Sequence, residues 1–251
     1  MSLAERHIVV SGAGSGVGAD IAALFADAGA RVTILGRRPQ PLEDVADRTG
    51  ARAEICDVTD RQSLDSALAR AARAQGPVDV AVANAGAAES VPFARMTGAD
   101  LEAMLSVNLG GVFHLWQACF PAMKKRGWGR LIAIASTAGL KGYPYVSAYC
   151  AAKHGVIGMT RALAVELAKT GVTVNAICPG FIETPLLERS IARIVESTGM
   201  SAEKAAASLR AGNPQDRFIG TDEVAGAALW LCSDAARSVN GHALSLAGGE
   251  L

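Results

Sequence analysis

Residues 7–18 read His7-Ile-Val-Val-Ser-Gly-Ala-Gly-Ser-Gly-Val-Gly18, a short β-branched run followed at once by a glycine-rich turn. The run predicts a buried strand, and the apolar positions Ile21, Leu24 and Phe25 predict a helix that ends at Gly29. A glycine-rich turn between a strand and a helix lets the backbone approach a pyrophosphate, which the helix amino terminus then stabilises. The stretch therefore predicts a dinucleotide site. The alternative is a tight turn whose glycines only pack the helix.

The same alternation of strand and helix continues along the chain. Short apolar runs predict six further strands, at 31–35, 51–56, 78–83, 130–135, 172–178 and 242–246. Such alternation is typical of a parallel, doubly wound sheet. At 251 residues the chain fits one α/β domain, although length alone would also permit two small ones. We therefore expect a single domain, 1–251, with helices on both faces of a seven-stranded parallel sheet.

The alternation lapses between about residues 184 and 220. Leu187, Ile191 and Ile194 lie on one face of a predicted helix, and 202–209 predicts a second, short one. An insertion of this length after the carboxyl end of a strand suits a mobile lid over a substrate. A fixed surface excursion is the alternative.

Composition weighs against several classes of function. The chain has 24 basic and 24 acidic residues, so its net charge of zero favours neither nucleic acid nor an anionic membrane as a partner. Its five cysteines include no CxxC pair, and its histidines have no carboxylate or thiolate at ligand spacing, so we expect reduced thiols and no metal site. The start lacks a signal-peptide pattern, and no apolar run approaches a membrane span. We expect a cytoplasmic protein.

The end of the second predicted strand bears on the choice of dinucleotide. In such folds the residues there meet the adenine ribose, where a carboxylate would hold the 2′-hydroxyl of NAD and an arginine accommodates the 2′-phosphate of NADP. Here Arg37 and Arg38 follow the strand and no acid is present. NADP(H) is therefore favoured and NAD(H) is possible. The alternative is that both arginines are merely solvated at a helix start.

Two further strand ends are candidates for the same site. Asp57 and Val58 close the third predicted strand and are placed to face the adenine ring. The fourth strand ends in Asn84-Ala85-Gly86, where a turn could bring the backbone against the cofactor. An ordinary strand-end turn is the alternative for these three residues.

Residues 136–153 carry the candidate chemistry. Ser136 follows the apolar strand, and a helix then opens with Tyr149 in its first turn and Lys153 one turn on. Residues four apart share a helix face, so the Lys153 ammonium and the positive end of the helix should lower the pKa of the Tyr149 phenol. A tyrosine of ordinary pKa about 10 then becomes usable as an acid or base near neutral pH. With the Ser136 hydroxyl as donor to a substrate oxygen, the stretch predicts proton transfer to a carbonyl or from an alcohol.

Helical sequence from Thr97 to about Lys125 contains an interruption. Asn108 lies there beside Gly110 and Gly111. A mid-helix amide next to two glycines is poor helix chemistry. We therefore expect a contact outside the helix to hold Asn108.

Taken together, these residues resemble the short-chain dehydrogenase/reductase family over nearly the whole chain. The Tyr-x-x-x-Lys pair alone is weak evidence because such spacing arises by chance. The ordered set is strong: the glycine turn, Asn84-Ala85-Gly86, Asn108, Ser136, and Pro179-Gly180 with Thr184. Residues 134–139, and Lys153-His-Gly155 through Pro185, look like bacterial 3-oxoacyl-thioester and polyketide ketoreductases. The resemblance implies a Rossmann-type fold, and a homotetramer that associates through helices here at about 101–125 and 149–169.

The resemblance also implies roles for individual residues. Tyr149 would be the general acid/base, and Lys153 would lower its pKa and hydrogen-bond the nicotinamide ribose. Ser136 would orient the substrate oxygen, while Asn108 would hold a water in a proton relay leading to Lys153. The substrate residues implied are Ser136, Ala138, Leu140, Tyr145 and Tyr149. The cofactor residues implied are Gly12, Ser15, Gly16, Val17, Gly18, Arg37, Arg38, Asp57, Val58, Asn84, Ala85, Gly86, Tyr149, Lys153, Pro179, Gly180, Ile182 and Thr184.

The departures from the family pattern are small. Ser11 replaces the usual threonine before the first glycine, and Ala83 stands where a second asparagine is common. Ser15 occupies a position where many NADP-preferring members carry a basic residue, which weakens the case for NADP(H).

Three functions stay open from the sequence. The first is an NADP(H)-dependent reductase of a 3-oxoacyl thioester, whose phosphopantetheine or CoA phosphate could meet Arg189, Arg193, Lys204 and Arg210 on the lid. The alternative for these four cations is that they only lie on solvated helix faces. The second is a dehydrogenase of a small or cyclic secondary alcohol, for which Leu140, Tyr143, Tyr145 and Val146 would form an apolar wall. The third is a non-catalytic dinucleotide sensor, against which the intact Ser136, Tyr149 and Lys153 argue.

Overall fold

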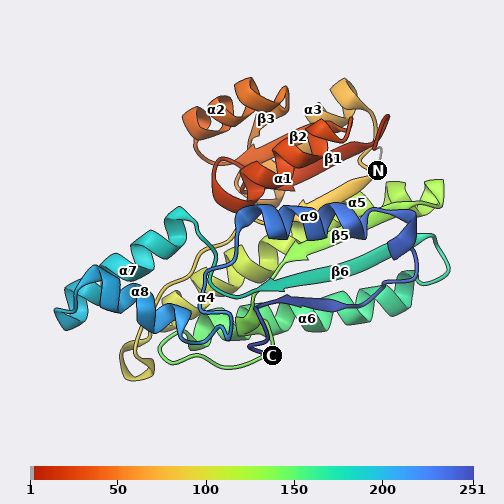
Figure 1. Ribbon diagram of the computed structural model, residues 1–251. Helices are drawn as coiled ribbons and strands as arrows, with labels where there is room; N and C mark the ends of the chain where they lie inside the picture. The colour runs from red at the N-terminus through yellow and green to blue at the C-terminus, as the bar shows by residue number, and fades with distance from the viewer. Residues whose placement is uncertain (1–2) are drawn as a thin grey trace.

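The computed structural model describes residues 3–251, which form a parallel sheet between two layers of helices (Figure 1). The strands are β1 (His7–Ser11), β2 (Arg31–Gly36), β3 (Arg52–Ile55), β4 (Val80–Ala83), β5 (Gly129–Ile134), β6 (Val172–Pro179) and β7 (Ala243–Leu246). They form one seven-stranded sheet in the order β3-β2-β1-β4-β5-β6-β7, and all the pairings are parallel. The predicted sheet is confirmed, with strand bounds shifted by only a residue or two.

The strand order reverses between β1 and β4. From β1 the sheet continues to β2 and β3 on one side, and from β4 it continues to β5, β6 and β7 on the other. Open α/β sheets bind ligands in the crevice outside the carboxyl ends of the strands at such a reversal. The glycine-rich turn follows β1 and Asn84 follows β4, so both predicted elements lie at this point.

Helices cover both faces of the sheet. On one face lie α1 (Gly16–Asp27), α2 (Pro39–Thr49) and α9 (Thr221–Leu231), with α1 packed against α9 (Figure 1). On the other face lie α3 (Arg61–Gln75), α5 (Gly111–Arg126) and α6 (Ser147–Leu167). Successive strand residues alternate between the two cores, as Ile8 and Val10 pack in the first and Val9 in the second. A sheet covered on both faces explains why its strands are near-continuous apolar runs.

Side-chain caps set where two helices begin. The Asp60 carboxylate accepts hydrogen bonds from the backbone N–H groups of Gln62 and Ser63 at the start of α3. Thr97 and Asp100 form a reciprocal capping box at the start of α4 (Gly98–Leu105). These bonds satisfy amide groups that the first helical turn leaves without partners. The start of α4 agrees with the helical sequence expected from Thr97.

The insertion expected at 184–220 projects beyond the sheet as α7 (Pro185–Thr198) and α8 (Ala202–Arg210) (Figure 1). Its base is held together by an isolated bridge between Ile182 and Ile219. The Ile219 N–H donates to the Phe181 carbonyl oxygen at 2.8 Å, and the Glu183 N–H donates to the Ile219 carbonyl oxygen at 3.1 Å. The insertion therefore leaves the domain and rejoins it at one point. Its movement over a substrate stays a prediction.

Three short 3-10 turns complete the path, at η1 (Phe93–Arg95), η3 (Thr137–Gly139) and η4 (Asp234–Ala236). Within residues 3–251 no helix combines the length and apolar character needed to cross a membrane. A search of the same residues finds no group of three or more His, Cys, Asp or Glu placed to hold a metal ion.

Candidate active site

The glycine turn lies directly against the end of β4. Gly12 has φ +66°, and a Cβ built on it would lie 2.6 Å from the Ala85 Cα. A Cβ on Gly18 would lie 2.5 Å from the Asn84 side-chain nitrogen and 2.6 Å from the Gly12 carbonyl oxygen. All three distances are far inside van der Waals contact, so only glycine fits at these two positions.

Hydrogen bonds join the ends of β1 and β4. The Ser11 hydroxyl oxygen accepts from the N–H groups of Asn84 and Ala85, each at 3.1 Å. The Asn84 side-chain amide donates in return to the carbonyl oxygens of Ser11 and Gly12, each at 3.0 Å. Ser11 stands where the family usually has threonine, and its hydroxyl thus links the ends of the two strands. Asn84 orders the turn, while Gly86 remains exposed at the crevice.

The amino terminus of α1 is open to a ligand. Ser15, at the N-cap position, is exposed and makes no side-chain capping bond, whereas Val17 is buried. Amide groups left free at the positive end of a helix bind phosphate. Gly16 (φ +55°) faces the Thr184 methyl group, which lies 3.1 Å from the position of a Cβ. The turn and the loop after β6 therefore face each other, and the residues present fit the pyrophosphate of a dinucleotide.

The residues expected around the adenosine lie at the ends of β2 and β3. The Arg37 side chain is 75% exposed and lies 3.8 Å from the Asp57 carboxylate. Arg38 is exposed at the N-cap of α2 and makes no side-chain capping bond. Both guanidinium groups are therefore accessible to a phosphate, which Arg binds with a planar fork of donors.

Asp57 and Val58 take different places. Burial acts to raise the pKa of Asp57, but two hydrogen bonds from Thr59 and the charge of Arg37 together hold it below its ordinary value. Val58 is buried, where its methyl group meets Gly111, and its carbonyl oxygen accepts from the His114 ring at 2.9 Å. Of the two, Asp57 is the residue that solvent reaches.

The two candidate hydroxyls meet at the carboxyl edge of the sheet. Ser136 follows β5 and begins η3, where its hydroxyl oxygen accepts from the Ala138 N–H at 3.1 Å. Tyr149 lies in the first turn of α6, as predicted, and its partly buried side chain is close enough to Ser136 for the serine hydroxyl to lower the pKa of the phenol. Serine and tyrosine side chains from two separate elements therefore converge on one point.

The predicted electrostatics of Tyr149 need correction. The Lys153 ammonium lies 5.5 Å from the centre of the Tyr149 ring, but its hydrogen bond goes to the Ile134 carbonyl oxygen at 3.0 Å. Burial raises the pKa of Tyr149 from 10.0 to about 12, although the Ser136 hydrogen bond opposes the change. Burial likewise lowers the pKa of Lys153 from 10.5 to about 8. The prediction that Lys153 makes the phenol more acidic is wrong for the protein alone, because loss of water outweighs proximity.

Asn108 lies in the π-helical turn η2 (Ser106–Gly110), between α4 and α5. It is fully buried, and its side chain accepts from the Ala87 N–H at 3.3 Å and donates to the Ala87 carbonyl oxygen at 2.8 Å. The expected outside contact is therefore the backbone that follows β4. A Cβ on Gly86 would lie 2.8 Å from the Asn108 side-chain oxygen and 3.8 Å from Lys153 Nζ, so these residues are neighbours. Such π turns are frequent at functional sites.

The residues predicted at the end of β6 lie beside the glycine turn. Pro179 is the last residue of β6, and the Gly180 N–H donates to the Leu246 carbonyl oxygen at 3.0 Å. Ile182 forms the bridge at the base of the insertion, and Thr184 is the N-cap of α7. Of this group, Thr184 is the residue that the structure brings against Gly16.

The predicted substrate residues are spread along the loop between β5 and α6. Ala138 is buried and Leu140 is partly buried, whereas the Tyr145 ring is 62% exposed. Tyr145 has φ +66°, and its carbonyl oxygen accepts from the Val91 N–H at 2.7 Å. Tyr143, which the sequence assigned only to an apolar wall, donates a hydrogen bond to Glu250. Sequence reasoning missed Glu250, because no spacing or motif relates the last turn of the chain to residue 143.

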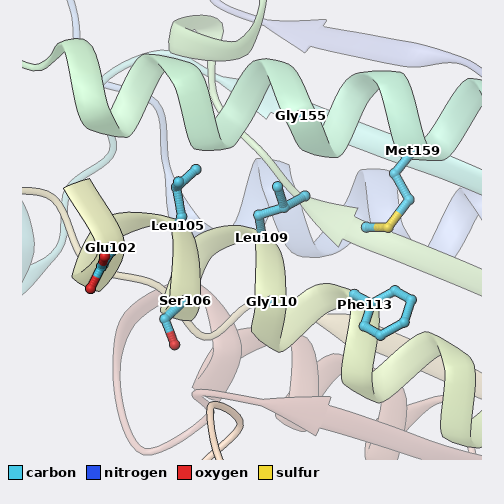
Figure 2. A pocket seen from close by; sticks show the side chains of 8 residues that line it. All are labelled: Glu102, Leu105, Ser106, Leu109, Gly110, Phe113, Gly155 and Met159. Carbon is cyan, nitrogen blue, oxygen red and sulfur yellow. The ribbon is translucent and has the colours of Figure 1, made fainter. Parts of the chain in front are cut away.

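An open groove lies away from these residues. A groove of about 610 Å³ runs between α4, η2 and α5 on one side and α6 on the other, with Leu109, Phe113 and Met159 along it (Figure 2). None of its lining residues is a candidate catalytic or cofactor residue. A smaller pocket of about 310 Å³ lies at the start of α7, lined by Thr184, Pro185, Leu187 and neighbouring residues.

Comparison with known proteins agrees with this geometry. The family described as short chain dehydrogenase matches residues 6–194. The chain belongs to the short-chain dehydrogenase family. This short-chain dehydrogenase is an oxidoreductase of the class that acts on CH–OH groups and ketones, as its similarity to proteins named as a dehydrogenase and a reductase indicates.

The relatives of this short-chain dehydrogenase span its full length. It is 36% identical to a D-beta-hydroxybutyrate dehydrogenase of Rhizobium meliloti, over 97% of this chain and 98% of the relative. It is also 36% identical to a putative ketoacyl reductase of Streptomyces coelicolor, over 96% of this chain and 95% of the relative. Among solved structures, a variant of actinorhodin polyketide ketoreductase with NADPH superposes with a TM-score of 0.95 at 34% identity, over 100% of this chain and 99% of the other. The resemblance to ketoreductases is confirmed.

Proposed function

We propose that this enzyme reduces a ketone to a secondary alcohol with NADPH, with Tyr149 as the proton donor. The observation that carries the proposal is the meeting of Ser136 and Tyr149, with Lys153 on the next helical turn, beside the open amino terminus of α1. A phenol with a pKa of about 12 is fully protonated near neutral pH, which is the form that an acid needs.

The cofactor would bind across the crevice at the strand reversal. Gly12, Gly16 and Gly18 would place backbone amides against the pyrophosphate, and Arg37 and Arg38 would hold the ribose phosphate of NADP(H). The bound nicotinamide supplies the hydride that the protein cannot. Exposure of both arginines and the NADPH of the similar ketoreductase support NADP(H) over NAD(H).

The chain's own side chains would handle the substrate oxygen. The Ser136 hydroxyl would donate to it and fix its position, and Tyr149 would deliver the proton. Lys153 would then hold the resulting phenolate by charge, since its ammonium is already within 5.5 Å of the ring centre. Asn108 would hold the backbone of Ala87 in place beside Lys153. A proton would return to Lys153 along this route.

A 3-oxoacyl thioester is the substrate class that we favour. The relatives named as ketoacyl reductases support this class, whereas the hydroxybutyrate dehydrogenases share the 3-oxo/3-hydroxy pattern but act by name on a free acid. Arg189, Arg193 and Lys204 are exposed on the insertion, where a phosphate-bearing carrier could meet them. Arg210 is less suitable, because it pairs with Asp216 at 3.5 Å.

A small or cyclic ketone is the second candidate. Levodione reductase superposes with a TM-score of 0.92 at 30% identity, over 98% of both chains. The edge-to-face contact of Tyr143 and Phe181, with ring centres 6.2 Å apart, would offer such a substrate an aromatic wall.

We also propose a cytoplasmic homotetramer. The groove of Figure 2 is apolar and lies on the two long helical segments predicted to associate. Phe113, which lines the groove, is 44% exposed, and Leu101 on α4 is 38% exposed, which favours burial against a second copy. The cysteines are all free thiols in the structure, which supports a reducing compartment.

A substrate panel run with both reduced cofactors tests the function. Acetoacetyl-CoA, ethyl acetoacetate and cyclohexanone should each be offered with NADPH and with NADH, with cofactor oxidation followed by the loss of absorbance of the reduced nicotinamide. We expect the thioester with NADPH to give the highest kcat/KM. A higher value for the cyclic ketone would select the second candidate, and no oxidation with any ketone would reject the proposal.

A further inference from the structure

The last turn of the chain folds back into the site. Gly248 and Gly249 have φ of +61° and +96°, and the Glu250 N–H donates to the Ala247 carbonyl oxygen at 3.1 Å. Positive φ at two successive residues reverses the backbone in a way that side chains resist. A Cβ on Gly249 would lie 3.7 Å from Pro214, so the tail also runs along the end of the insertion.

The Glu250 carboxylate is buried by this turn, with its side chain only 5% exposed. One of its oxygens lies 2.7 Å from Lys141 Nζ and accepts from the Tyr143 hydroxyl, also at 2.7 Å. The backbones of Gly180 and Gly212 pack close to it, since Cβ atoms there would lie 3.4 and 3.0 Å from its oxygens. A carboxylate held by a cation and a hydroxyl in a tight enclosure is a built feature, because a buried charge is costly unless it is paired.

This carboxylate connects to the serine turn. The Tyr143 hydroxyl also lies 2.7 Å from the Thr137 hydroxyl, and Thr137 directly follows Ser136. The Lys141 N–H donates to the Thr137 carbonyl oxygen at 3.0 Å. Lys141 is the only charged residue between Ser136 and Tyr149. Glu250 therefore both cancels the single charge of this loop and fixes the loop's tyrosine.

We propose that Glu250 is a specificity-determining residue, which keeps the substrate loop electrically neutral and so favours 3-oxo esters and thioesters, whose acyl group is uncharged, over free 3-oxo acids. The inference rests on the proposed reduction of a ketone. A free 3-oxo acid carries its carboxylate close to the ketone, where an unpaired Lys141 would attract it and the paired one does not. Glu250 is a positioning residue, because it acts through Lys141 and Tyr143.

The test compares ethyl acetoacetate with acetoacetate, using the full chain with NADPH. In Glu250→Gln the amide oxygen can still accept from Tyr143, but the charge of Lys141 is released. We expect the ratio of kcat/KM for ester over acid to fall about fivefold, mainly through a lower KM for acetoacetate. The double variant Glu250→Gln/Lys141→Met should restore the ratio of the unmodified protein.

A second variant changes the charge in the other direction. Lys141→Met leaves the Glu250 carboxylate unpaired, so the preference for the ester should rise by a similar factor. Glu43→Gln makes the same chemical change on the exposed surface of α2 and should leave the ratio unchanged. An unchanged ratio in both Glu250→Gln and Lys141→Met overturns the proposal.

The outcomes also separate this inference from the proposed function. Absence of ketone reduction by the unmodified protein rejects the function itself. Reduction that proceeds with a ratio insensitive to both variants rejects only the role of Glu250. Far-UV circular dichroism shows whether Glu250→Gln folds. If it does not, Lys141→Met alone decides: a higher ester-over-acid ratio supports the proposal, and an unchanged or lower ratio overturns it.

Discussion

Lys153 donates its hydrogen bond to the Ile134 carbonyl oxygen while its ammonium lies 5.5 Å from the centre of the Tyr149 ring. The lysine is thus anchored to the end of β5 and held at a fixed distance from the phenol. Its side chain is buried, so its charge depends on pH within an accessible range. The anchor places this titration beside the candidate proton donor.

The pH dependence of ketone reduction should report Lys153. Its pKa is lowered by burial to about 8, so the ammonium is present below that pH and is lost above it, whereas Tyr149, with a pKa of about 12, stays protonated throughout. We expect kcat to stay constant from pH 6 to 7. Above about pH 8 it should decrease, with a slope that approaches a tenfold loss for each pH unit. Lys153→Arg keeps its charge at these pH values and should flatten the descending limb. A limb that persists unshifted in that variant would assign it to another group.

Tyr149→Phe should separate binding from chemistry. The change removes one hydroxyl and keeps the ring, so NADPH should bind with an affinity within about twofold of the unmodified protein, while kcat should fall by roughly three orders of magnitude or more. Fluorescence titration gives the affinity, and NADPH oxidation gives the rate. Turnover unaffected by the substitution would remove Tyr149 from the mechanism.

The pair Arg37→Ala/Arg38→Ala should distinguish the two cofactors. Both side chains are exposed at the end of β2, and only NADPH carries the phosphate that they would bind. We expect the Kd for NADPH to rise by about 10- to 100-fold and the Kd for NADH to change little, as loss of charge-assisted hydrogen bonds typically costs 1.5–3 kcal/mol. Isothermal titration with both cofactors measures this. Equal weakening of both would contradict phosphate recognition.

Gly18→Ala should damage the glycine turn. The new Cβ would lie 2.5 Å from the Asn84 side-chain nitrogen and 2.6 Å from the Gly12 carbonyl oxygen, so the link between β1 and β4 must shift. We expect a loss of about 1–3 kcal/mol in the free energy of unfolding, together with weaker cofactor binding. Gly226→Ala in α9 is the matched control, since a Cβ there meets nothing within 4 Å and alanine favours a helix. If both substitutions destabilised the protein equally, the close contact of Gly18 with Asn84 and Gly12 would not be the cause.

The order of strands and helices was predictable because apolar period and turn chemistry are local. Thr97 could be recognised as the start of helical sequence, and the unusual setting of Asn108 correctly indicated an outside contact. The pKa values of the site residues were harder to predict from the sequence. The spacing of Tyr149 and Lys153 shows that they share a helix face, but the degree of burial that raises one pKa and lowers the other depends on the whole fold.

Contacts between distant parts of the chain were the least predictable. Glu250 meets Tyr143 across more than a hundred residues, and nothing in the sequence around either one marks the other. The facing of Gly16 and Thr184 was reached only through family resemblance. Local patterns specify elements, whereas tertiary packing specifies which side chains from those elements become neighbours.

The bridge between Ile182 and Ile219 has a consequence for how this scaffold can diversify. Because the two helices beyond it begin and end at a single closed junction, they can be lengthened, shortened or exchanged without altering the register of any strand. A chimaera that carries the corresponding excursion of another reductase should therefore fold on the same sheet. New substrate ranges can arise by replacing this one module while the hydride-transfer machinery is inherited intact.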